Sequence, residues 1–464
     1  MPMTAIVLAA GEGTRMKSRH PKVMHKLLDR PLVSWVTRAA REAGAGRIVV
    51  VVGHGADEVR AHLADEGDVE CVEQAERLGT GHAVRVALEA TGVSSGPVVV
   101  LNGDLPLVEP ATVRAFADAV ADGTHAAAIL TMTPPDPFGY GRVELAADGS
   151  VTRVIEQRDC TPEQAEALTE CNAGCYAFDG ALLAAHIGEV GNSNAQHEYY
   201  LPDMVEILRG HGHATTIVHC EDYREGLGAN NRAQLAELTR LAQERINERL
   251  MDEGVSMLDP RTVWVGPDVT VGRDTVLLPM TMLWGSTTVG EECTIGPNTR
   301  LTNCTVADHV SLEETVGVDV TVERDVTCGP RAYLRGGAHV LEGAHVGTHV
   351  EIKNSTIGRG SKVPHLSYIG DCTMGAGVNI GGGSITCNYD GVHKNRTTIG
   401  DNVFVGSDTM MVAPVTIGDG ALVGASSCVT RDVPADALYL ERAEQRIVEG
   451  YASRRLERLK RDEA

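Results

Sequence analysis

Aliphatic or other apolar side chains recur at every sixth position through much of the C-terminal half of the chain. The first run is Val265, Val271, Leu277, Leu283, Val289, Ile295 and Leu301. After a slip of a few residues the rhythm resumes at Val316, Val322, Cys328, Leu334, Val340, Val346 and Ile352. Two further runs are Ile357, Val363, Ile369 and Ile399, Val405, Met411, Ile417, Val423, Val429. A strict period of six predicts short strands, each with one inward side chain, wound three to a coil and stacked into a parallel β-helix.

Glycines and one break punctuate this repeat. Glycine follows the apolar residue at Gly266, Gly272, Gly290, Gly296, Gly400, Gly406, Gly418 and Gly424, where we expect turns with positive φ. Residues 386–398 (TCNYDGVHKNRTT) have no six-residue rhythm, which predicts a loop leaving one face of the solenoid. Loops on a rigid scaffold often carry function. A sandwich of short strands is the alternative, although its strands are usually spaced more widely and less regularly.

The N-terminal half alternates between apolar strands and amphipathic helices. Strand-like runs are 4–8, 48–52, 98–101 and 127–132, and helix-like segments include 32–43 and 83–90. This alternation predicts an α/β doubly wound, Rossmann-like sheet. Ligands of such sheets bind at the carboxyl ends of the strands, and Gly11, Arg15 and residues 102–104 all follow predicted strands.

Two longer helices are expected outside these units. Residues 231–253 place Leu235, Leu238, Ala242 and Ile246 on one face at helical spacing, and residues 441–460 form a second helical pattern. We therefore predict a nucleotide-binding domain over 1–231, a helical linker over 232–253, and a β-helix domain with a C-terminal helix over 254–464.

Composition narrows the classes of function. The formal net charge of -22 argues against non-specific nucleic-acid binding, while 51 glycines and 4% aromatic residues suit a thin solenoid. There is no apolar run long enough to span a bilayer, and the first residues lack the pattern of a signal peptide. The eleven cysteines form no CxxC pair, which favours free thiols in a reducing compartment. We expect a cytoplasmic protein without membrane insertion.

The loop after the first predicted strand offers a phosphate site. GEGTRM lacks the third glycine of the dinucleotide fingerprint, but its two glycines let backbone N–H groups approach a phosphate, and Arg15 and Lys22 can neutralise it. A tight turn with solvated charges is the alternative. Asp104 ends the run LNGDLP; in isolation it fits turn chemistry, and beside a phosphate loop it fits a Mg²⁺ ligand.

These motifs stand in the order found in one enzyme family. LAAGEGTRMKSRHPKVMH is similar to the opening motif of sugar-1-phosphate nucleotidyltransferases, and QAERLGTGHA, NGDLPL, GYGRV and NNR follow in that family's order. The repeat resembles hexapeptide acyltransferases, whose β-helix is left-handed, and it carries EGAHVGTHVEIKNS, GSKVPHLSYIGD, VNIGGGSITCNYDG and VFVGSD. The whole chain resembles the bifunctional N-acetylglucosamine-1-phosphate uridyltransferase / glucosamine-1-phosphate N-acetyltransferase family.

The resemblance implies roles for residues of the N-terminal domain. UTP and Mg²⁺ would bind there, with the phosphates held by Arg15 and Lys22, and Mg²⁺ by Asp104 and Asn230. The uridine end would contact Leu8, Ala9, Ala10, Gly11, Gln74, Gly79 and Thr80. Asn102 and Gly103 would line the site, and the N-acetylated sugar would contact Gly141, Glu156 and Asn172.

For the C-terminal domain the resemblance implies an acetyltransferase site and a homotrimer with shared acyl sites. The sugar phosphate would bind Arg335, Lys353 and Lys394, with Tyr368 and Asn379 beside the acceptor. Acetyl-CoA would contact Gly382, Asn388, Tyr389, Ser407, Ala425 and Arg442. His365 would be the general base, because an ammonium cannot attack a thioester. A histidine in a repeat is more often structural, and only the motif around His365 favours catalysis.

Several positions depart from the usual pattern of the family. Ala173 stands where a small hydroxyl residue is common, and His197 where glycine is usual, so the sugar pocket is where we expect divergence. The resemblance implies acetylation of glucosamine-1-phosphate followed by uridylylation, a step in the supply of cell-wall precursors. A paralogue making another nucleotide-activated sugar is the alternative. A third hypothesis is an oligomerisation scaffold with a vestigial nucleotide-sensing head, which the retention of Arg15, Asp104 and His365 disfavours.

Overall fold

The chain divides into two compact units, Met1–Ile246 and Asn247–Ala464. The structure, a computed structural model, describes residues 2–194, 196–441 and 444–462. Helix α8 (Arg232–Asp252) crosses the division between the units. The three-part division at 231 and 253 stays a prediction.

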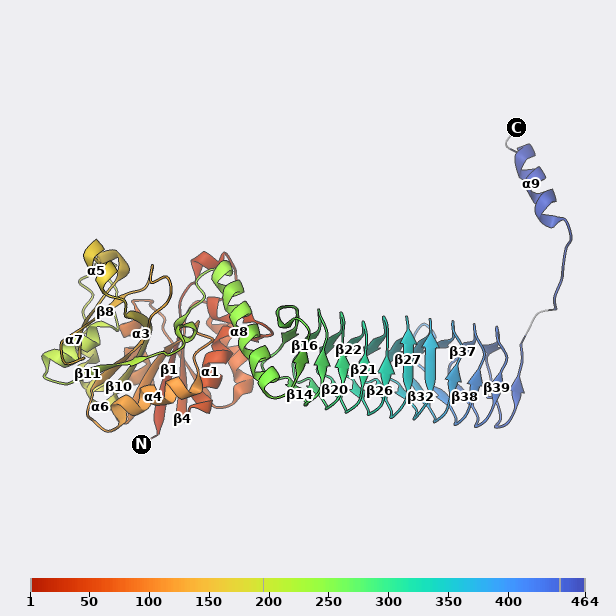
Figure 1. Ribbon diagram of the computed structural model, residues 1–464, viewed down its shortest axis with the longest axis horizontal. Coiled ribbons are helices and arrows are strands. Elements are labelled where there is room, and N and C mark those ends of the chain that lie inside the picture. The colour runs from red at the N-terminus through yellow and green to blue at the C-terminus, as the bar shows by residue number, and fades with distance from the viewer. Residues whose placement is uncertain (1, 195, 442–443, 463–464) are drawn as a thin grey trace. The chain divides into compact units, whose positions relative to one another are not determined.

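A mixed sheet forms the centre of the N-terminal unit (Figure 1). Its strand order is β11 (Thr215–His219), β7 (Ala127–Met132), β10 (Cys171–Asp179), β6 (Pro97–Asn102), β1 (Met3–Ala9), β4 (Ala45–Val52) and β5 (Val69–Glu73). Neighbours pair in parallel, except that β10 runs antiparallel to both β6 and β7. A hairpin of β8 (Arg142–Leu145) and β9 (Val151–Ile155) joins β10. The four predicted strands are confirmed, and the antiparallel strand was not predicted.

Helices cover both faces of this sheet. The side chains of β1 and β4 alternate between two cores: Val7 and Val50 face α1 (Leu32–Glu42), α2 (Ala56–Leu63) and α4 (Pro110–Ala121). Ile6 and Val49 face α3 (Thr80–Thr91), α6 (Gly180–His186) and α7 (Asp203–Gly210). Burial on both faces explains why these strands read as continuous apolar runs. The predicted doubly wound arrangement is confirmed.

Smaller elements complete this unit. The hairpin of β2 (Lys26–Leu27) and β3 (Arg30–Pro31) precedes α1, and α5 (Pro162–Ala167) precedes β10. The predicted apolar face of α8 is confirmed, since Leu238 and Ala242 pack with Leu27, Leu32 and Leu107. This helix therefore completes the core of the N-terminal unit.

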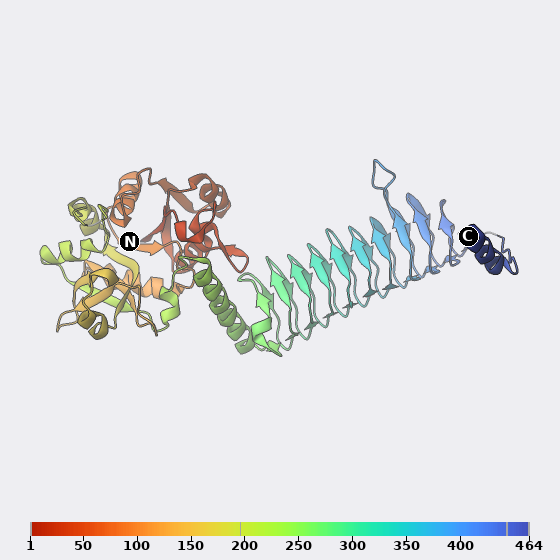
Figure 2. The same ribbon diagram turned by 90° about the horizontal axis from the view of Figure 1, so that it is seen from above.

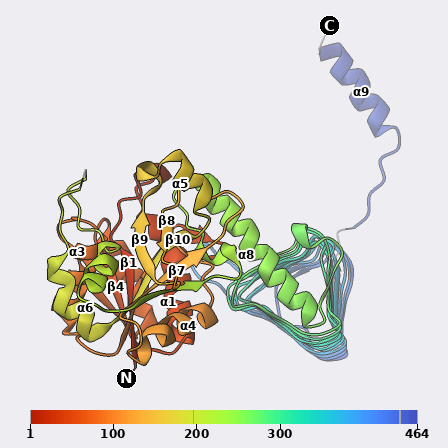
Figure 3. The ribbon, with the colours of Figure 1, turned by 60° about the vertical axis from the view of Figure 1, so that its left-hand side comes forward.

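The second unit is a three-sided parallel β-helix, whose triangular section is visible in Figure 3. One side contains β12 (Ser256–Met257), β15 (Val276–Leu277), β18 (Thr294–Ile295), β21 (Ser311–Leu312), β24 (Thr327–Cys328), β27 (His345–Thr348), β30 (Lys362–His365), β33 (Asn379–Ile380), β36 (Phe404–Val405), β39 (Leu422–Val423) and β41 (Leu438–Tyr439). The second contains β13 (Trp264–Val265), β16 (Met282–Trp284), β19 (Arg300–Thr302), β22 (Val316–Val318), β25 (Tyr333–Arg335), β28 (Glu351–Lys353), β31 (Tyr368–Gly370), β34 (Ile385–Cys387), β37 (Met410–Val412) and β40 (Cys428–Val429). The third contains β14 (Thr270–Val271), β17 (Thr288–Val289), β20 (Thr305–Val306), β23 (Thr321–Val322), β26 (His339–Val340), β29 (Thr356–Ile357), β32 (Cys372–Met374), β35 (Thr397–Ile399) and β38 (Val415–Ile417).

The six-residue repeat supplies the core of the β-helix. The inward positions of its runs are buried, as predicted, with one exception. Val316 is only half-buried, and Gly317 occupies the inward position, paired with Leu301 and Leu334. A Cβ on Gly317 would lie 2.9 Å from the Leu301 side chain. The prediction at Val316 was therefore wrong by one residue, because this coil has no room for a side chain at its inward position.

The glycines that follow the inward residues serve a different purpose from the predicted one. Among the eight, only Gly296 has a positive φ. At Gly272 and Gly290 an added Cβ would lie 2.6 Å and 2.7 Å from backbone atoms of the next coil. Close stacking of coils, and not a left-handed turn, requires glycine there. Many positive-φ turns fall instead on aspartate and asparagine, such as Asp274 and Asn303.

Two segments outside the regular coils were also predicted. The interruption leaves the stack of strands as a projecting loop (Figure 2), although Thr386 remains in β34 and Thr397 begins β35. The predicted C-terminal helix over 441–460 begins later, as α9 (Tyr451–Asp462). Gly450 precedes it with φ 67°, a conformation that cannot continue an α-helix.

Candidate active sites

The glycine-rich loop follows β1 and leads into a 3₁₀ turn over Thr14–Met16. Gly13 has φ 62°, and a Cβ there would lie 2.6 Å from the Lys22 Cβ. Gly13 thus lets Lys22 pack against the loop. A Cβ at Gly11 would meet open space within the described part of the chain, so the backbone of this glycine is accessible to a ligand.

Four predicted residues meet at one point in the N-terminal unit. The Lys22 ammonium donates to the Asp104 Oδ2 at 2.5 Å and to the Asn230 Oδ1 at 3.0 Å. The Arg15 guanidinium donates to the same Asn230 oxygen at 2.9 Å. These residues lie up to 215 positions apart in the sequence. Two cations and two oxygen donors are therefore brought within reach of one bound phosphate or metal ion.

Two cavities meet at this cluster. One, of about 530 Å³, is lined by Leu8, Ala10, Gly11, Gln74, Gly79 and Thr80. The other, of about 550 Å³, is lined by Arg15, Gly141, Glu156, Asn172 and Asn230. Lys22, Asn102 and Asp104 line both. The residues expected at the nucleotide and those expected at the sugar thus separate into two cavities with a common charged wall.

Hydrogen bonds hold the walls of these cavities in place. The Gln74 amide donates to the Gly79 carbonyl at 3.0 Å, and the Thr80 hydroxyl accepts from the Leu201 N–H at 3.1 Å. In the second cavity, the Asn172 amide donates to the Tyr176 hydroxyl at 2.7 Å. Burial raises the pKa of Tyr176 well above its ordinary value, so its hydroxyl stays protonated.

Three residues predicted in or beside these sites do not line either cavity. Ala9 is buried in the core, and Gly103 packs beneath the Leu8 carbonyl, to which its N–H donates at 2.9 Å; neither lines a cavity. His197 was expected beside the sugar pocket, but the neighbouring residues Glu198 and Tyr200 line the first cavity. The alternation of a strand explains Ala9, since adjacent side chains face opposite sides of the sheet.

Sequence reasoning missed other residues of these walls. Arg77 lines the first cavity, with its guanidinium 3.7 Å from the Glu12 carboxylate; its place between Gln74 and Gly79 was the available signal. Tyr140 and Phe138 line the second cavity and adjoin the recognised GYGRV motif. Gln234 reaches it from α8, and nothing in its helical pattern distinguishes it.

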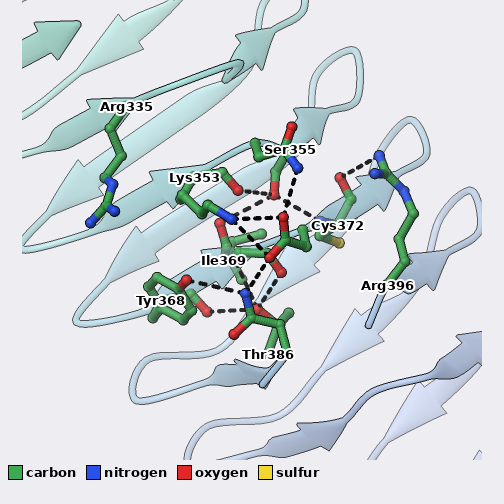
Figure 4. A network of polar contacts seen from close by, with 12 residues as sticks. Arg335, Lys353, Ser355, Tyr368, Ile369, Cys372, Thr386 and Arg396 are labelled. Atoms are coloured by element: carbon green, nitrogen blue, oxygen red, sulfur yellow. Dashed lines mark hydrogen bonds and ion pairs between the residues drawn. The ribbon is translucent and has the colours of Figure 1, made fainter. Parts of the chain in front are cut away.

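In the β-helix, Arg335, Lys353 and Tyr368 end or begin three consecutive strands of one side, β25, β28 and β31. Arg335 and Lys353 are register partners. Figure 4 shows Lys353 and Tyr368 reaching into one network of polar contacts, with Arg335 apart from it. The Arg335 guanidinium instead donates to the Glu351 carboxylate at 2.9 Å.

Asp371 lies at the centre of this network, and sequence reasoning missed it. Its carboxylate accepts from the Lys353 ammonium at 2.8 Å and 3.0 Å, from the Asn354 amide at 2.6 Å and from the Asn388 amide at 2.5 Å. The Asn388 amide also donates to the Tyr368 hydroxyl at 3.3 Å. The motif YIGD carries Asp371, but a turn explained that aspartate equally well.

The predicted base and three of the predicted acetyl-CoA residues lie along one corner of the β-helix in consecutive coils. His365, Gly382, Ser407 and Ala425 lie at or after the ends of β30, β33, β36 and β39. A Cβ on Gly382 would lie 3.4 Å from the His365 Cβ, and the Ser426 N–H donates to the Ser407 carbonyl at 2.8 Å. Asn379 is paired with Lys362 of the strand that carries His365. The His365 side chain is exposed.

The predicted site residues of the projecting loop differ in their exposure to solvent. Asn388 is buried within the Asp371 network, whereas Tyr389 is 61% exposed and Lys394 is exposed. Tyr389 and Lys394 are bridged across the base of the loop. Arg442, the remaining predicted residue, lies outside the described residues.

The cysteines and the helices bear on the expectations of free thiols and of no membrane insertion. All eleven cysteines lie within the described ranges and are free. Among the described residues, no helix has the length and apolar character needed to cross a membrane.

Comparison with known proteins agrees with the two-unit architecture. Residues 5–159 match the model of the MobA-like NTP transferase domain. Residues 396–431 match the model of the bacterial transferase hexapeptide (six repeats). The predicted nucleotidyltransferase head and left-handed hexapeptide β-helix are thereby confirmed.

Full-length relatives decide the family. The Bifunctional protein GlmU of Streptomyces griseus is 47% identical over 98% of this chain and 95% of its own. Those of Geobacter metallireducens and Trichlorobacter lovleyi are 48% and 44% identical, over 96% and 95% of this chain and 97% and 96% of their own. The chain belongs to the GlmU family. Membership confirms the prediction of a bifunctional uridyltransferase and acetyltransferase.

Proposed function

We propose that the chain makes UDP-N-acetylglucosamine in two steps. The β-helix transfers an acetyl group from acetyl-CoA to the amine of glucosamine-1-phosphate. The N-terminal unit then transfers a uridylyl group from UTP to the N-acetylglucosamine-1-phosphate, with release of pyrophosphate. The observation that carries the proposal is the common wall of Lys22, Asn102 and Asp104, at which a nucleotide cavity and a sugar cavity meet.

Uridylyl transfer joins two anions that repel each other, and we assign Arg15 and Lys22 to offset this repulsion. A sugar phosphate oxygen attacks the α-phosphorus, and this nucleophile needs no base because it is already ionised. Arg15 and Lys22 offset the repulsion between the phosphates and hold them for in-line attack. Both cations donate to Asn230, so they would approach a bound phosphate from the same side.

Asp104 and Asn230 fit Mg²⁺. A carboxylate and an amide carbonyl are hard oxygen donors of the kind that Mg²⁺ prefers. Both oxygens already lie within hydrogen-bonding distance of one cation, the Lys22 ammonium. Bound there, Mg²⁺ would supply positive charge beside the triphosphate, while Lys22 would turn to the phosphate oxygens.

We assign one cavity to each end of the product, the first to the uridine end and the second to the N-acetylated sugar. In the first, Gln74, Gly79 and Thr80, whose polar groups are held in place by hydrogen bonds within the protein, line the wall at which we place uracil. In the second, Gly141, Glu156 and Asn172 surround the N-acetylated sugar. Glu156 offers a carboxylate for sugar hydroxyls, which carboxylates accept readily.

For acetyl transfer we assign His365 as the general base. The attacking amine must lose a proton, and an imidazole is suited to accept it near neutral pH. Arg335, Lys353 and Lys394 hold the phosphate of the sugar, with Tyr368 and Asn379 beside the acceptor. Acetyl-CoA would extend along the corner formed by Gly382, Ser407 and Ala425, next to Asn388 and Tyr389 of the loop.

A homotrimer is part of the proposal. Outward side chains of Phe404, Leu422 and Leu438 form a column along β36, β39 and β41, and they are 49%, 44% and 60% exposed. An exposed apolar column beside an acyl site suits contact with another copy of the chain. The cytoplasm, which holds UTP and acetyl-CoA, is the proposed location.

A coupled assay tests the proposal. The full chain is supplied with glucosamine-1-phosphate, acetyl-CoA, UTP and Mg²⁺, and the products are identified by mass spectrometry. UDP-N-acetylglucosamine, free CoA and pyrophosphate are expected. The His365→Gln variant should accept added N-acetylglucosamine-1-phosphate but not glucosamine-1-phosphate. Folded protein that catalyses neither half-reaction would refute the proposal.

A second candidate substrate comes from the sugar cavity. Ala173 lines that cavity at a position where the resemblance led us to expect a hydroxyl residue. A different sugar-1-phosphate could fill the space. A panel of sugar-1-phosphates and nucleoside triphosphates decides between the two, with the ratio of kcat/KM values as the measure.

A further inference from the structure

Asp371 connects residues that the proposed function assigns to two different substrates. Lys353 belongs to the proposed sugar-phosphate site and Asn388 to the proposed acetyl-CoA site, and the Asp371 carboxylate accepts hydrogen bonds from both. Asn388 in turn contacts the Tyr368 hydroxyl. The network in Figure 4 is therefore continuous from Lys353 to Tyr368.

The position of Asp371 makes its carboxylate a rigid anchor. The residue is 5% exposed and follows β31 in a left-handed turn with φ 51°. Its N–H donates to the Lys353 carbonyl at 2.9 Å, and its carbonyl accepts from the Thr397 N–H at 3.2 Å. Side chain and backbone thus bind Asp371 to the coils on either side of its own.

Burying the Asp371 carboxylate costs desolvation free energy, which its hydrogen-bond partners offset. Burial alone would raise the pKa of Asp371, but hydrogen bonds from Lys353, Asn354 and Asn388 lower it below its ordinary value. The same contact raises the pKa of Lys353. Both groups are therefore charged at neutral pH.

We propose that Asp371 is a positioning residue of the acetyltransferase site. This inference rests on the proposed function. Asp371 holds the Lys353 ammonium and the Asn388 amide in fixed places before substrates arrive. A free lysine side chain would lose rotational freedom when it binds a phosphate; a lysine already held by Asp371 loses less and keeps a donor for the ligand.

The Asp371→Asn variant tests this role, with Asp319→Asn as the matched control. Asp319 occupies the same kind of left-handed turn, after β22 on the same side of the β-helix, with φ 52°. Steady-state acetylation with each substrate varied should show KM for glucosamine-1-phosphate raised about tenfold or more in Asp371→Asn, because a charged hydrogen bond is lost. Asp319→Asn should match the wild type, and uridylyl transfer should be unchanged in both.

A double-mutant cycle separates positioning from mere stability. In a Lys353→Ala background, Asp371→Asn should change KM for glucosamine-1-phosphate much less than in the wild type. Equal effects in the two backgrounds, or an unchanged KM in the single variant, would overturn the inference. A wild-type chain that does not acetylate glucosamine-1-phosphate would instead refute the proposed function, so the two failures are distinguishable.

A separate observation concerns the end of the N-terminal unit's α6. His186 ends this helix, Glu189 ends the 3₁₀ turn that follows it, and His211 follows the end of α7. The Glu189 carboxylate is 2.7 Å from the His186 Nδ1 and 2.9 Å from the His211 Nε2. The three ligand atoms lie within 4.8 Å of one another, and none of these residues lines either head cavity.

We infer that His186, Glu189 and His211 form a surface site for a divalent transition metal such as Zn²⁺. Two imidazoles and a carboxylate are a donor set that zinc accepts, with solvent in a fourth position. The carboxyl ends of α6 and α7 add partial negative charge.

Zinc titration of the full chain in excess Mg²⁺ tests this site. Isothermal calorimetry should show a zinc site in the wild type that is weakened at least tenfold in His211→Ala and in His186→Ala. His213→Ala is the matched control, since the His213 ring lies 6.4 Å from that of His186 outside the three-ligand set, and it should bind zinc as the wild type does. Equal zinc affinity in the wild type and His211→Ala would overturn the inference.

Discussion

At the scale of single residues, the functional side chains are held by other polar groups and not left free. Lys22 is shared between Asp104 and Asn230, and Lys353 is held by Asp371. Each lysine thereby has a fixed direction toward a cavity or a corner where an anion is expected. This preorganisation lowers the entropy lost when the phosphate binds.

The Asp104→Asn variant tests the head chemistry. The amide keeps the shape of the side chain but loses the charge that would bind Mg²⁺ and face Lys22. We expect uridylyl transfer to fall by roughly 10²–10³-fold, measured as pyrophosphate release, while acetyl transfer is unchanged. A variant with wild-type pyrophosphate release would show that Asp104 is not needed for this step.

Acid should weaken the Asp371 network in a defined range. The folded-state pKa of Asp371 lies below the ordinary 3.8, so its contribution to stability is present above that value and is lost as the pH falls through the lowered one. The difference in free energy of unfolding between the wild type and Asp371→Asn should be constant from about pH 7 to about pH 5 and shrink as the pH falls through 3.8 and below it. Denaturant melts at these pH values measure it; a difference that grows on acidification would contradict the assignment.

At the scale of elements, most strands of the β-helix bury an inward side chain at the repeat position, so neighbouring coils must match in volume. Leu301 and Gly317 are register partners in β19 and β22. The leucine fills the space that the glycine leaves, since a Cβ on Gly317 would lie 2.9 Å from it. The irregular step in the repeat is therefore a packing compensation between two coils.

Substitutions at these two positions should be coupled. Gly317→Ala overpacks the coil and should cost about 1–3 kcal/mol, and Leu301→Ala leaves a cavity and should cost about 2–5 kcal/mol. The double variant should be more stable than the sum of the two effects predicts, because alanine at 317 enters the vacated space. Thermal unfolding measures all three, and Arg300→Ala, an outward change on β19, is the control. Strict additivity would contradict the packing argument.

At the scale of the whole molecule, the proposed trimer can be measured directly. Light scattering during gel filtration should give three times the 49.3 kDa chain mass. Replacing Phe404 and Leu422 together by Asp should reduce the mass toward that of one chain and impair acetylation, because a charge would be buried in the apolar contact. Leu258→Asp, at an apolar position near the start of the β-helix that is 75% exposed, should remain trimeric. A monomeric wild type would contradict the proposal.

The two activities should also complement each other in mixtures. Asp104→Asn lacks the second step and His365→Gln the first, and the intermediate, N-acetylglucosamine-1-phosphate, is a small diffusible molecule. Equal amounts of the two variants, incubated with glucosamine-1-phosphate, acetyl-CoA and UTP, should form UDP-N-acetylglucosamine where neither variant alone does. Failure of the mixture, with both half-reactions intact, would show that the intermediate is not released.

The sequence by itself determined the features that depend on local periodicity and chain-continuous motifs. The six-residue repeat predicted the β-helix and, apart from Val316, the inward residues of its four regular runs, because the repeat is local and independent of distant contacts. It did not predict the inward residues between those runs, such as Val306, Leu312 and Ile380. Apolar runs predicted strands β1, β4, β6 and β7, because a strand that is buried on both faces has a continuous apolar sequence. The loop at 388–396 followed from the interruption of the same rhythm.

The tertiary structure decided everything that depends on residues distant in sequence. It placed β10 antiparallel between β6 and β7, brought Asn230 to Arg15 and Lys22, and separated the nucleotide and sugar residues into two cavities. It also showed that Gly317, and not Val316, faces the core, and that Asp371 connects Lys353 to Asn388. The sequence does not distinguish an aspartate that only forms a turn from one, such as Asp371, that also binds several side chains. The difference depends on which coils stack above and below the residue.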